Sequence, residues 1–306
     1  MKTDSQKKTG MLLEIQRFCL HDGPGIRTTV FFKGCPLRCK WCSNPESQSF
    51  RPQLQFVETS CIRCGRCIKA CPAGAMRRDP TGKTHHLPEK CGSHFACVAV
   101  CPTKALRIAG RRWTVEAAVR EIEKDKVFFR EGGGVTFSGG EVLAQIDFAE
   151  QLAEALHREG IHITCETTGF SSEESFRRLL RWCDLLYFDV KHWNSRQHLQ
   201  GTGVEIEKIL DHLQLAIDAK IPLAVRIPVI PRFNDQPEDQ RQFCQLLKKY
   251  QIQEVHLLPF HQFGSGKYQQ LGLEYEYQHD KSMKKEELEG FAEMLRQEIP
   301  KVQIGG

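Results

Sequence analysis

Cysteine is concentrated in one part of this chain of 306 residues, and this concentration constrains the fold more than any other feature. Eleven of the 14 cysteines lie between Cys19 and Cys101. The N-terminus lacks the apolar run of a secretory signal, so disulfide bonds are not expected, and thiols at this density are typical of metal or redox sites. The later cysteines stand singly in apolar stretches and are expected to be small buried residues: Cys165, Cys183 and Cys244.

Outside the cysteine-rich stretch, short apolar runs alternate with helical patterns. Val115, Val119 and Ile122, for example, recur at helical spacing after Thr114, a favourable N-cap. Six runs are expected to be β-strands: residues 28–32, 135–138, 161–165, 185–190, 223–227 and 255–258. Strands that alternate with helices predict an α/β fold with a parallel sheet, and the pattern suits an open doubly wound sheet as well as an incomplete barrel.

The alternation stops between about residues 57 and 107. Here CIRCGRCIKACPAGAM and CGSHFACVAVCPTKAL align without a gap, which predicts an internal duplication. The first half contains the bacterial ferredoxin run, in which the fourth cysteine binds the other cluster. This rule predicts two [4Fe-4S] clusters, one held by Cys61, Cys64, Cys67 and Cys101 and the other by Cys71, Cys91 and Cys97. His94 stands where the second half would have its second cysteine. His94 could bind iron in place of the cysteine, could be an unligated histidine, or could mark a degraded cluster. For the whole segment, a zinc ribbon is the alternative to two iron-sulfur clusters.

A separate site follows the first expected strand, in FFKGCPLRCKWCSNPE. Cys35, Cys39 and Cys42 are spaced Cys-x3-Cys-x2-Cys at the carboxyl end of that strand, where barrel active sites form. Three thiolates on a four-iron cubane leave one iron without a protein ligand, and an open position allows a metal centre to bind substrate. Zinc is the alternative, but no fourth Cys or His follows at ligand spacing before the insertion.

This spacing, with Trp41 before the third cysteine, resembles the radical S-adenosylmethionine superfamily. In that superfamily the methionyl amine and carboxylate chelate the open iron, and the reduced cluster splits the sulfonium into methionine and a 5′-deoxyadenosyl radical. Longer motifs narrow the resemblance to the activating enzymes of glycyl radical enzymes, of the pyruvate formate-lyase activating type: HDGPGIRTTVFFKGC, SGGEV, FDVKH and LLPFHQFGSGKY. These motifs span nearly the whole chain.

The resemblance implies an incomplete (β/α)6 barrel, formed by residues 1–56 and 108–306, with a ferredoxin-like two-cluster domain inserted at residues 57–107. It implies three [4Fe-4S] clusters, S-adenosylmethionine, and hydrogen abstraction from a glycine of a partner glycyl radical enzyme. The implied catalytic residues are Cys35, Cys39, Cys42 and Lys191. The implied cofactor-binding residues are Trp41, Cys42, Ser43, Gly139, Gly140, Glu141, Glu166, Thr167, Asp189, Val190, Lys191, Arg226 and His261.

Several of these residues have a specific role in the family. The loop at Ser138 to Glu141 binds the methionyl amine, and the Glu141 carboxylate is suited to accept from an ammonium. Lys191 contacts the cofactor directly. Asp189, with the residues at Glu166 and Thr167, lies by the cofactor carboxylate, where the resemblance also raises a monovalent cation, although the family often carries Asp where Glu166 stands. Solvated charges at strand ends are the alternative.

Three further residues stand out. Arg226 is a charge within an apolar strand, and buried charges are normally paired, so a cofactor carboxylate is its expected partner. By resemblance, His261 contacts the adenosyl group and Asp22 contacts the glycine-bearing loop of the partner enzyme. A plain turn is the alternative for Asp22.

The charge balance constrains partners less than the cysteines do. The net charge of +5 comes from 43 basic and 38 acidic residues that are spread along the chain, which we interpret as solubility rather than nucleic-acid binding. No run approaches the roughly 18 apolar residues of a membrane helix, so a cytoplasmic protein is expected. The resemblance implies reduced flavodoxin or ferredoxin as electron donor. Two other functions remain open: a multi-cluster electron carrier without catalysis, and a radical enzyme that acts on another peptide or a small molecule.

Overall fold

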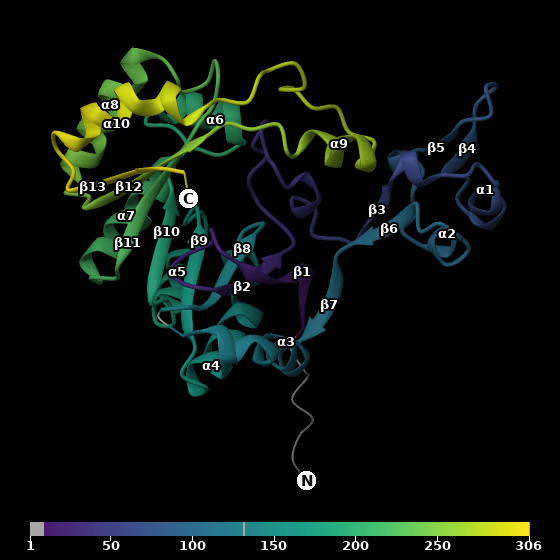
Figure 1. Ribbon diagram of the computed structural model, residues 1–306, viewed down its shortest axis with the longest axis horizontal. Coiled ribbons are helices and arrows are strands. Elements are labelled where there is room, and N and C mark those ends of the chain that lie inside the picture. Colours follow the sequence, from purple (N-terminus) through teal and green to yellow (C-terminus); the bar gives the residue numbers. More distant parts are fainter. Residues whose placement is uncertain (1–8, 131, 306) are drawn as a thin grey trace, which may run out of the picture.

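The fold centres on one nine-stranded sheet, shown in a computed structural model that describes residues 9–130 and 132–305 (Figure 1). Residues 1–8, in which the sequence analysis found no apolar leader, lie outside the described part, as do residues 131 and 306. The strand order is β13-β12-β11-β10-β9-β8-β2-β1-β7. The bounds are β1 Thr9–Cys19, β2 Arg27–Phe32, β7 Arg111–Thr114, β8 Gly134–Gly139, β9 His162–Thr167, β10 Leu185–Asp189, β11 Leu223–Val229, β12 Glu254–Pro259 and β13 Lys301–Ile304.

All six expected strands are present, as β2 and β8 to β12, and each pairs in parallel with the next along the chain. A doubly wound sheet reverses its strand order, whereas these strands follow chain order, so the doubly wound alternative is wrong. This order is the one expected of a barrel that does not close. Three strands of this sheet were not predicted: β13 extends the parallel part at one edge, while β1 and β7 pair antiparallel at the other. The short edge strands β7 (RRWT) and β13 (KVQI) lack the apolar run that marked the others.

The α-helices that follow the cysteine-rich segment are α3 Val115–Ile122, α4 Ile146–Arg158, α5 Glu173–Leu180, α6 Ser195–Thr202, α7 Glu207–Asp218, α8 Pro237–Lys249, α9 Ser265–Leu271 and α10 Glu289–Arg296. Six of these helices, α3, α4, α5, α7, α8 and α10, contribute apolar side chains to the main core against one face of the sheet. Thr114 caps α3 as expected, because its hydroxyl accepts from the Ala117 amide at 3.2 Å. Among the described residues, no helix is long and apolar enough to cross a membrane.

Alternation along the strands gives the sheet two unlike faces. In β8, Val135 and Phe137 are fully buried in the main core with the helices, whereas Thr136 between them lies outside that core. The same alternation in β11 places Val225 in the core and turns Arg226 to the other face. Polar side chains therefore collect on the inner face of the sheet. Of the late cysteines, Cys165 and Cys183 are buried as expected, whereas Cys244 is only half-buried, so that expectation is wrong for Cys244.

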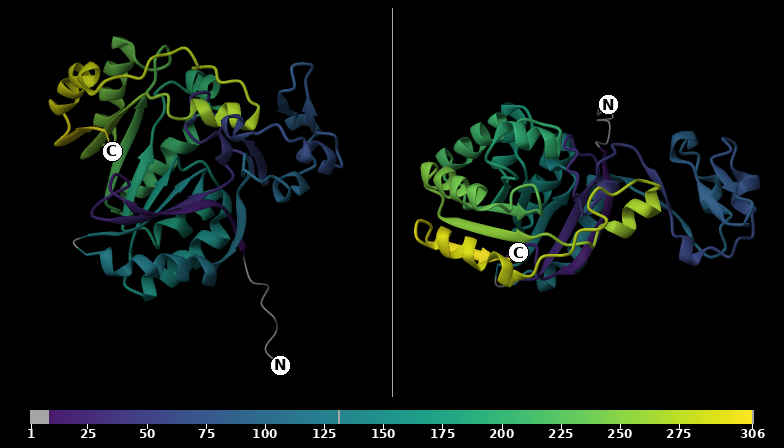
Figure 2. Two further views of the ribbon diagram at one scale, coloured as in Figure 1. Left: turned by 45° about the vertical axis from the view of Figure 1, so that its right-hand side comes forward. Right: turned by 90° about the horizontal axis from the view of Figure 1, so that it is seen from above.

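The cysteine-rich segment forms a separate small unit that projects from the side of the sheet (Figures 1 and 2). An antiparallel pair, β3 Gln53–Phe56 and β6 Leu106–Ala109, closes the segment at its base. Between them lie α1 Arg66–Ala70, β4 Met76–Arg78, β5 Thr84–His86 and α2 Ala96–Ala99, and β4 pairs with β5. The unit has its own apolar cluster, formed by Leu54, Met76, Cys97 and Leu106.

Candidate active site

The loop with Cys35, Cys39 and Cys42 is fixed on both sides by hydrogen bonds. The Gly34 amide donates to the Ser47 carbonyl at 2.6 Å, and the Arg38 amide donates to the Thr202 carbonyl at 2.6 Å. Just before the loop, the fully buried Lys33 donates to the Glu46 carbonyl and to the Gln53 side chain. The loop that follows β2 is therefore held in place before any ligand binds.

Burial keeps the three thiols protonated. It raises the pKa of Cys39 to about 12 and raises the pKa values of Cys35 and Cys42 above that of an ordinary thiol. Such thiols lose their protons when a metal cation replaces them, so the set fits iron ligation. Within residues 9–130 and 132–305, no three His, Cys, Asp or Glu side chains converge tightly enough to hold a single metal ion. The three sulfur atoms instead line a cavity.

This cavity lies at the carboxyl ends of β2, β8, β9 and β10. Its walls are Cys35, Leu37, Cys39, Cys42, Ser47, Gln48, Ser138, Gly139, Gly140, Glu141, Glu166, Thr167, Thr168, Asp189 and Lys191. The structure thus brings together most of the residues that the sequence analysis selected. It adds Leu37, Ser47, Gln48 and Thr168. Leu37 lies inside the cysteine motif, Ser47 and Gln48 directly follow it, and Thr168 directly follows Thr167, so closeness in the sequence to selected residues was the available signal.

The buried Glu141 carboxylate has protein donors on both oxygens. One oxygen accepts from Thr167 and from the Leu143 amide, and the other accepts from the amide and hydroxyl of Thr168, at 3.0 and 2.7 Å. Burial raises the pKa of Glu141, which these hydrogen bonds oppose. A carboxylate accepts about four hydrogen bonds, so none of this capacity remains for an ammonium. Glu141 joins the end of β8 to the end of β9 and shapes the loop.

Arg226 and Glu166 form a partly buried ion pair, with 2.5 Å between guanidinium and carboxylate. Ser138 also donates to Glu166, and the Arg226 guanidinium lies 3.6 Å from the centre of the Tyr187 ring. Burial raises the pKa of Glu166 in spite of the arginine. The sequence analysis expected a cofactor carboxylate as the partner of Arg226, whereas the structure provides a protein carboxylate. The Arg226 Nε atom is nevertheless buried without a hydrogen-bond partner among the described residues.

Asp189 and Lys191 supply the second charged pair of the cavity, at 2.7 Å. Burial alone would lower the pKa of Lys191, but the negative charge of Asp189 and the hydrogen bond to its carboxylate raise that pKa above its ordinary value. Lys191 therefore stays protonated beside the three sulfurs. The cavity combines three thiols with the Lys191 ammonium and three carboxylates, those of Glu141, Glu166 and Asp189.

Comparison with known proteins decides the family of the chain. The family model described as the radical SAM superfamily matches residues 29–244. The choline trimethylamine-lyase activating enzyme of Oleidesulfovibrio alaskensis is 38% identical over 297 residues, covering 95% of this chain and 96% of that protein. The chain is a radical SAM activating enzyme. The benzylsuccinate synthase activating enzyme of Thauera aromatica is 39% identical over 309 residues, covering 98% and 93% of the two chains.

A solved structure agrees at the level of the fold. Streptococcus suis SuiB bound to precursor peptide SuiA matches with a TM-score of 0.56 at 10% identity, over 89% of this chain and 46% of that one. Radical SAM proteins use S-adenosylmethionine and a [4Fe-4S] cluster, and membership of this family implies both for this activating enzyme.

Five of the predicted cofactor residues lie outside the cavity walls. Trp41 packs behind the cysteine loop, 4.4 Å from the Phe233 ring. Val190 is buried in the main core, and its amide donates to the Arg226 carbonyl at 2.9 Å. The loop with His261 approaches Ser43, because a Cβ on Gly264 would lie 2.8 Å from the Ser43 Cα. Arg226 sits behind Glu166. These residues surround the cavity or lie beyond its mouth.

Arg27 is a residue that the sequence analysis quoted within a motif but gave no role. It is fully buried, and it donates to the carbonyls of Pro24, Gly132 and Val135 and to the hydroxyl of Thr136. Burial lowers the pKa of this guanidinium to about 10. It fixes the loop that carries Asp22, whose carboxylate accepts from Thr29 at 2.5 Å. The sequence signal that could have indicated a structural role for Arg27 is its place at the start of an apolar strand, where a charged residue is normally paired.

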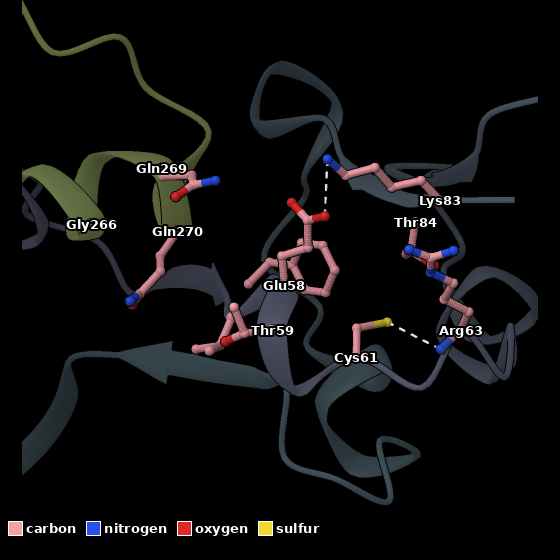
Figure 3. A pocket seen from close by; sticks show the side chains of 11 residues that line it. Glu58, Thr59, Cys61, Arg63, Lys83, Thr84, Gly266, Gln269 and Gln270 are labelled. Atoms are coloured by element: carbon pink, nitrogen blue, oxygen red, sulfur yellow. Dashed lines mark hydrogen bonds and ion pairs between the residues drawn. The ribbon is translucent and has the colours of Figure 1, made fainter. Parts of the chain in front are cut away.

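Helix α9 connects the cysteine loop to the projecting unit of this activating enzyme. At one side, the Lys267 ammonium lies 2.7 Å from Glu46 and donates to Asn44 at 2.6 Å. At the other side, Gln269 and Gln270 line a hollow of about 670 Å³ together with Cys61 and the Glu58–Lys83 ion pair (Figure 3). The helix also packs against β3.

The thiols of the projecting unit surround two separate hollows. Cys61, Cys64, Cys67 and Cys101 line one, and Cys71, Cys91, Cys97 and His94 line the other. These are the two groups given by the crossing rule of two-cluster ferredoxins. His94 takes the fourth place in the second group.

Proposed function

We propose that this activating enzyme cleaves S-adenosylmethionine reductively and removes a hydrogen atom from a backbone glycine of a partner glycyl radical enzyme. The observation that carries the proposal is the cavity itself: three half-buried thiols, Lys191 paired with Asp189, and Glu166, which pairs with Arg226 behind the cavity wall, meet at one edge of the sheet. An electron carrier would need no such charged cavity beside a three-thiol site.

The residues fit the two cofactors. Three thiols leave one iron of a cubane open, and the unpartnered Nε of Arg226 is a buried donor available to an anionic group. When bound, the cluster and S-adenosylmethionine supply one electron and a 5′-deoxyadenosyl radical. The chain holds the glycine beside C5′ and excludes water, and the hydrogen atom moves from the glycine Cα to C5′. A bound cation is not part of the proposal, because Glu166 and Thr167 already have protein partners.

The test is formation of a protein radical. The reduced activating enzyme is mixed anaerobically with S-adenosylmethionine and, in separate samples, with glycyl radical enzymes such as choline trimethylamine-lyase and benzylsuccinate synthase, since the relatives are named for them. We expect one partner to give a glycyl radical by electron paramagnetic resonance, together with 5′-deoxyadenosine.

A partner with glycine deuterated at Cα should transfer deuterium to 5′-deoxyadenosine, and the same partner with alanine at that position is the control. Cleavage of S-adenosylmethionine without a radical on any partner would instead favour an enzyme that acts on another peptide or a small molecule.

The projecting unit, residues 57–107, is proposed to be a ferredoxin-like domain that holds two further [4Fe-4S] clusters. This is supported by its two thiol-lined hollows. The barrel would then comprise residues 1–56 and 108–306.

The charge of this segment suggests the kind of electron donor. Residues 57–107 contain nine Lys and Arg and only three Asp and Glu, so the excess positive charge of the chain lies here. The expectation that basic residues are spread evenly is wrong. A basic surface attracts an acidic partner, and we propose an acidic flavodoxin or ferredoxin as the donor.

Electrons would then pass from the domain to the cysteine loop by way of α9, which contacts both. Replacing Cys101 with alanine removes a ligand from the cluster next to α9. We expect turnover with reduced flavodoxin or ferredoxin to fall by about tenfold or more, while turnover with dithionite, which reaches the loop directly, stays within about twofold. Steady-state formation of 5′-deoxyadenosine measures turnover with the protein donor and turnover with dithionite. Equal losses with the two reductants would indicate a structural role for the domain.

A further inference from the structure

We propose that His94 is the fourth iron ligand of the second cluster, so that the domain holds one cluster on four cysteines and one on three cysteines and a histidine. The inference rests on the proposed function only in that residues 57–107 bind clusters. It concerns which atoms bind the iron, and it is tested separately from the radical chemistry.

The two halves of the domain have the same backbone plan, thirty residues apart. The turns Glu58–Ser60 and Pro88–Lys90 precede Cys61 and Cys91. The strand pairs are related in the same way, since Phe56 opposite Leu106 corresponds to His86 opposite Met76. In this plan His94 corresponds to Cys64, and each lines the hollow of its own cysteines. The duplication therefore places the imidazole in a ligand position.

The turn around His94 keeps a conformation that its own sequence disfavours. Cys64 is flanked by Arg63 and Gly65, with φ of 56° and 75°, and His94 is flanked by Ser93 and Phe95, with φ of 55° and 57°. Phe95 occupies the left-handed region of backbone conformation, where the first half has Gly65. A bulky residue is strained in this conformation. A surface histidine with no ligand role would give no reason to retain this turn.

Gly92 provides the space that an imidazole needs and a thiol does not. A Cβ on Gly92 would lie 2.4 Å from the His94 ring, so any larger residue would displace the ring. The first half has Ile62 at the corresponding position, beside the smaller Cys64. The φ of Gly92 is not positive, so the backbone does not require glycine there. Gly92 therefore leaves the room that the His94 imidazole occupies.

The consequence is that the two clusters of the domain differ. A neutral imidazole in place of a thiolate makes a cluster less negative by one charge and raises its reduction potential. The cluster of Cys71, Cys91, His94 and Cys97 would therefore take up an electron more readily than the cluster of Cys61, Cys64, Cys67 and Cys101.

The test uses full-length protein with Cys42→Ala, which removes the radical SAM cluster and leaves the domain clusters for spectroscopy. Protein grown with ¹⁴N or ¹⁵N histidine is reconstituted, reduced with dithionite and measured by pulsed electron paramagnetic resonance. We expect a nitrogen coupling that changes with the isotope, disappears in His94→Ala and disappears in Gly92→Ile, which keeps the imidazole but displaces it. In His94→Cys the nitrogen coupling should vanish and the iron content should be unchanged. The reduction potential of the second cluster should fall.

His86→Ala is the matched control. Unlike the exposed His94, His86 has both ring nitrogens buried without a hydrogen-bond partner among the described residues, and it does not line the hollow. Its substitution should leave the coupling intact. A coupling that survives His94→Ala, or two complete clusters with no histidine coupling, would overturn the assignment. Formation of 5′-deoxyadenosine by protein with Cys42 intact is measured in parallel, and its failure would count against the proposed function alone.

Discussion

Cys42→Ala is expected to abolish cleavage of S-adenosylmethionine, with 5′-deoxyadenosine formation lowered by at least about 10³-fold under dithionite. Cys42 is one of three half-buried thiols around the cavity, and their loop is held in place by hydrogen bonds of the chain. With two thiols left, the cluster loses the ligand set that keeps one iron open in a fixed orientation. The measurement is chromatographic quantification of 5′-deoxyadenosine in anaerobic samples of equal protein content.

Cys244→Ala is the control for this variant, because Cys244 is a half-buried thiol on α8 that does not line the cavity. It should retain wild-type activity. If wild type and Cys42→Ala are both inactive although the clusters reduce normally, addition of partner enzymes separates a requirement for the partner from the electron-carrier alternative. Equal activity of wild type and Cys42→Ala would mean that S-adenosylmethionine is not cleaved at the site of Cys35, Cys39 and Cys42.

Arg27→Met is expected to cost about 3–5 kcal/mol of folding free energy, the largest loss of stability that we predict for one substitution. Methionine fills much of the same volume but donates no hydrogen bonds, so the carbonyls of Pro24, Gly132 and Val135 lose their donor inside the protein. The loop with Asp22 should loosen as well. Urea denaturation followed by circular dichroism under anaerobic conditions gives the shift in midpoint.

The exposed Arg177, which pairs with Glu173 one helical turn away on α5, provides the matched control. Arg177→Met should change stability by at most about 0.5 kcal/mol, because exposed ion pairs contribute little. Equal midpoints for Arg27→Met and wild type would mean that water replaces the guanidinium, and the positioning role given to Arg27 would be withdrawn.

The parallel strands could be predicted because each has an apolar run bounded by turn residues. β7 and β13 could not, since a short charged edge strand is defined by the strand it pairs with. In the same way, the motifs located the ends of β8, β9 and β10, and the polar residues there line one cavity. What the motifs could not predict was whether a given carboxylate is free. Glu141 is fully occupied by Thr167, Thr168 and Leu143, and Glu166 is paired with Arg226.

The sequence by itself determined which thiols group together, because metal ligands within a loop are only a few residues apart and their spacing survives any folding of the rest. It also determined the α/β class, because hydrophobic periodicity is local. Only the tertiary structure decided that the strands follow chain order, that Arg27 holds the loop of Asp22, and that Gly92 makes room for His94. The first two depend on contacts between residues far apart in the chain, such as Arg27 and Val135. The third depends on the direction of a side chain, which the backbone turn sets.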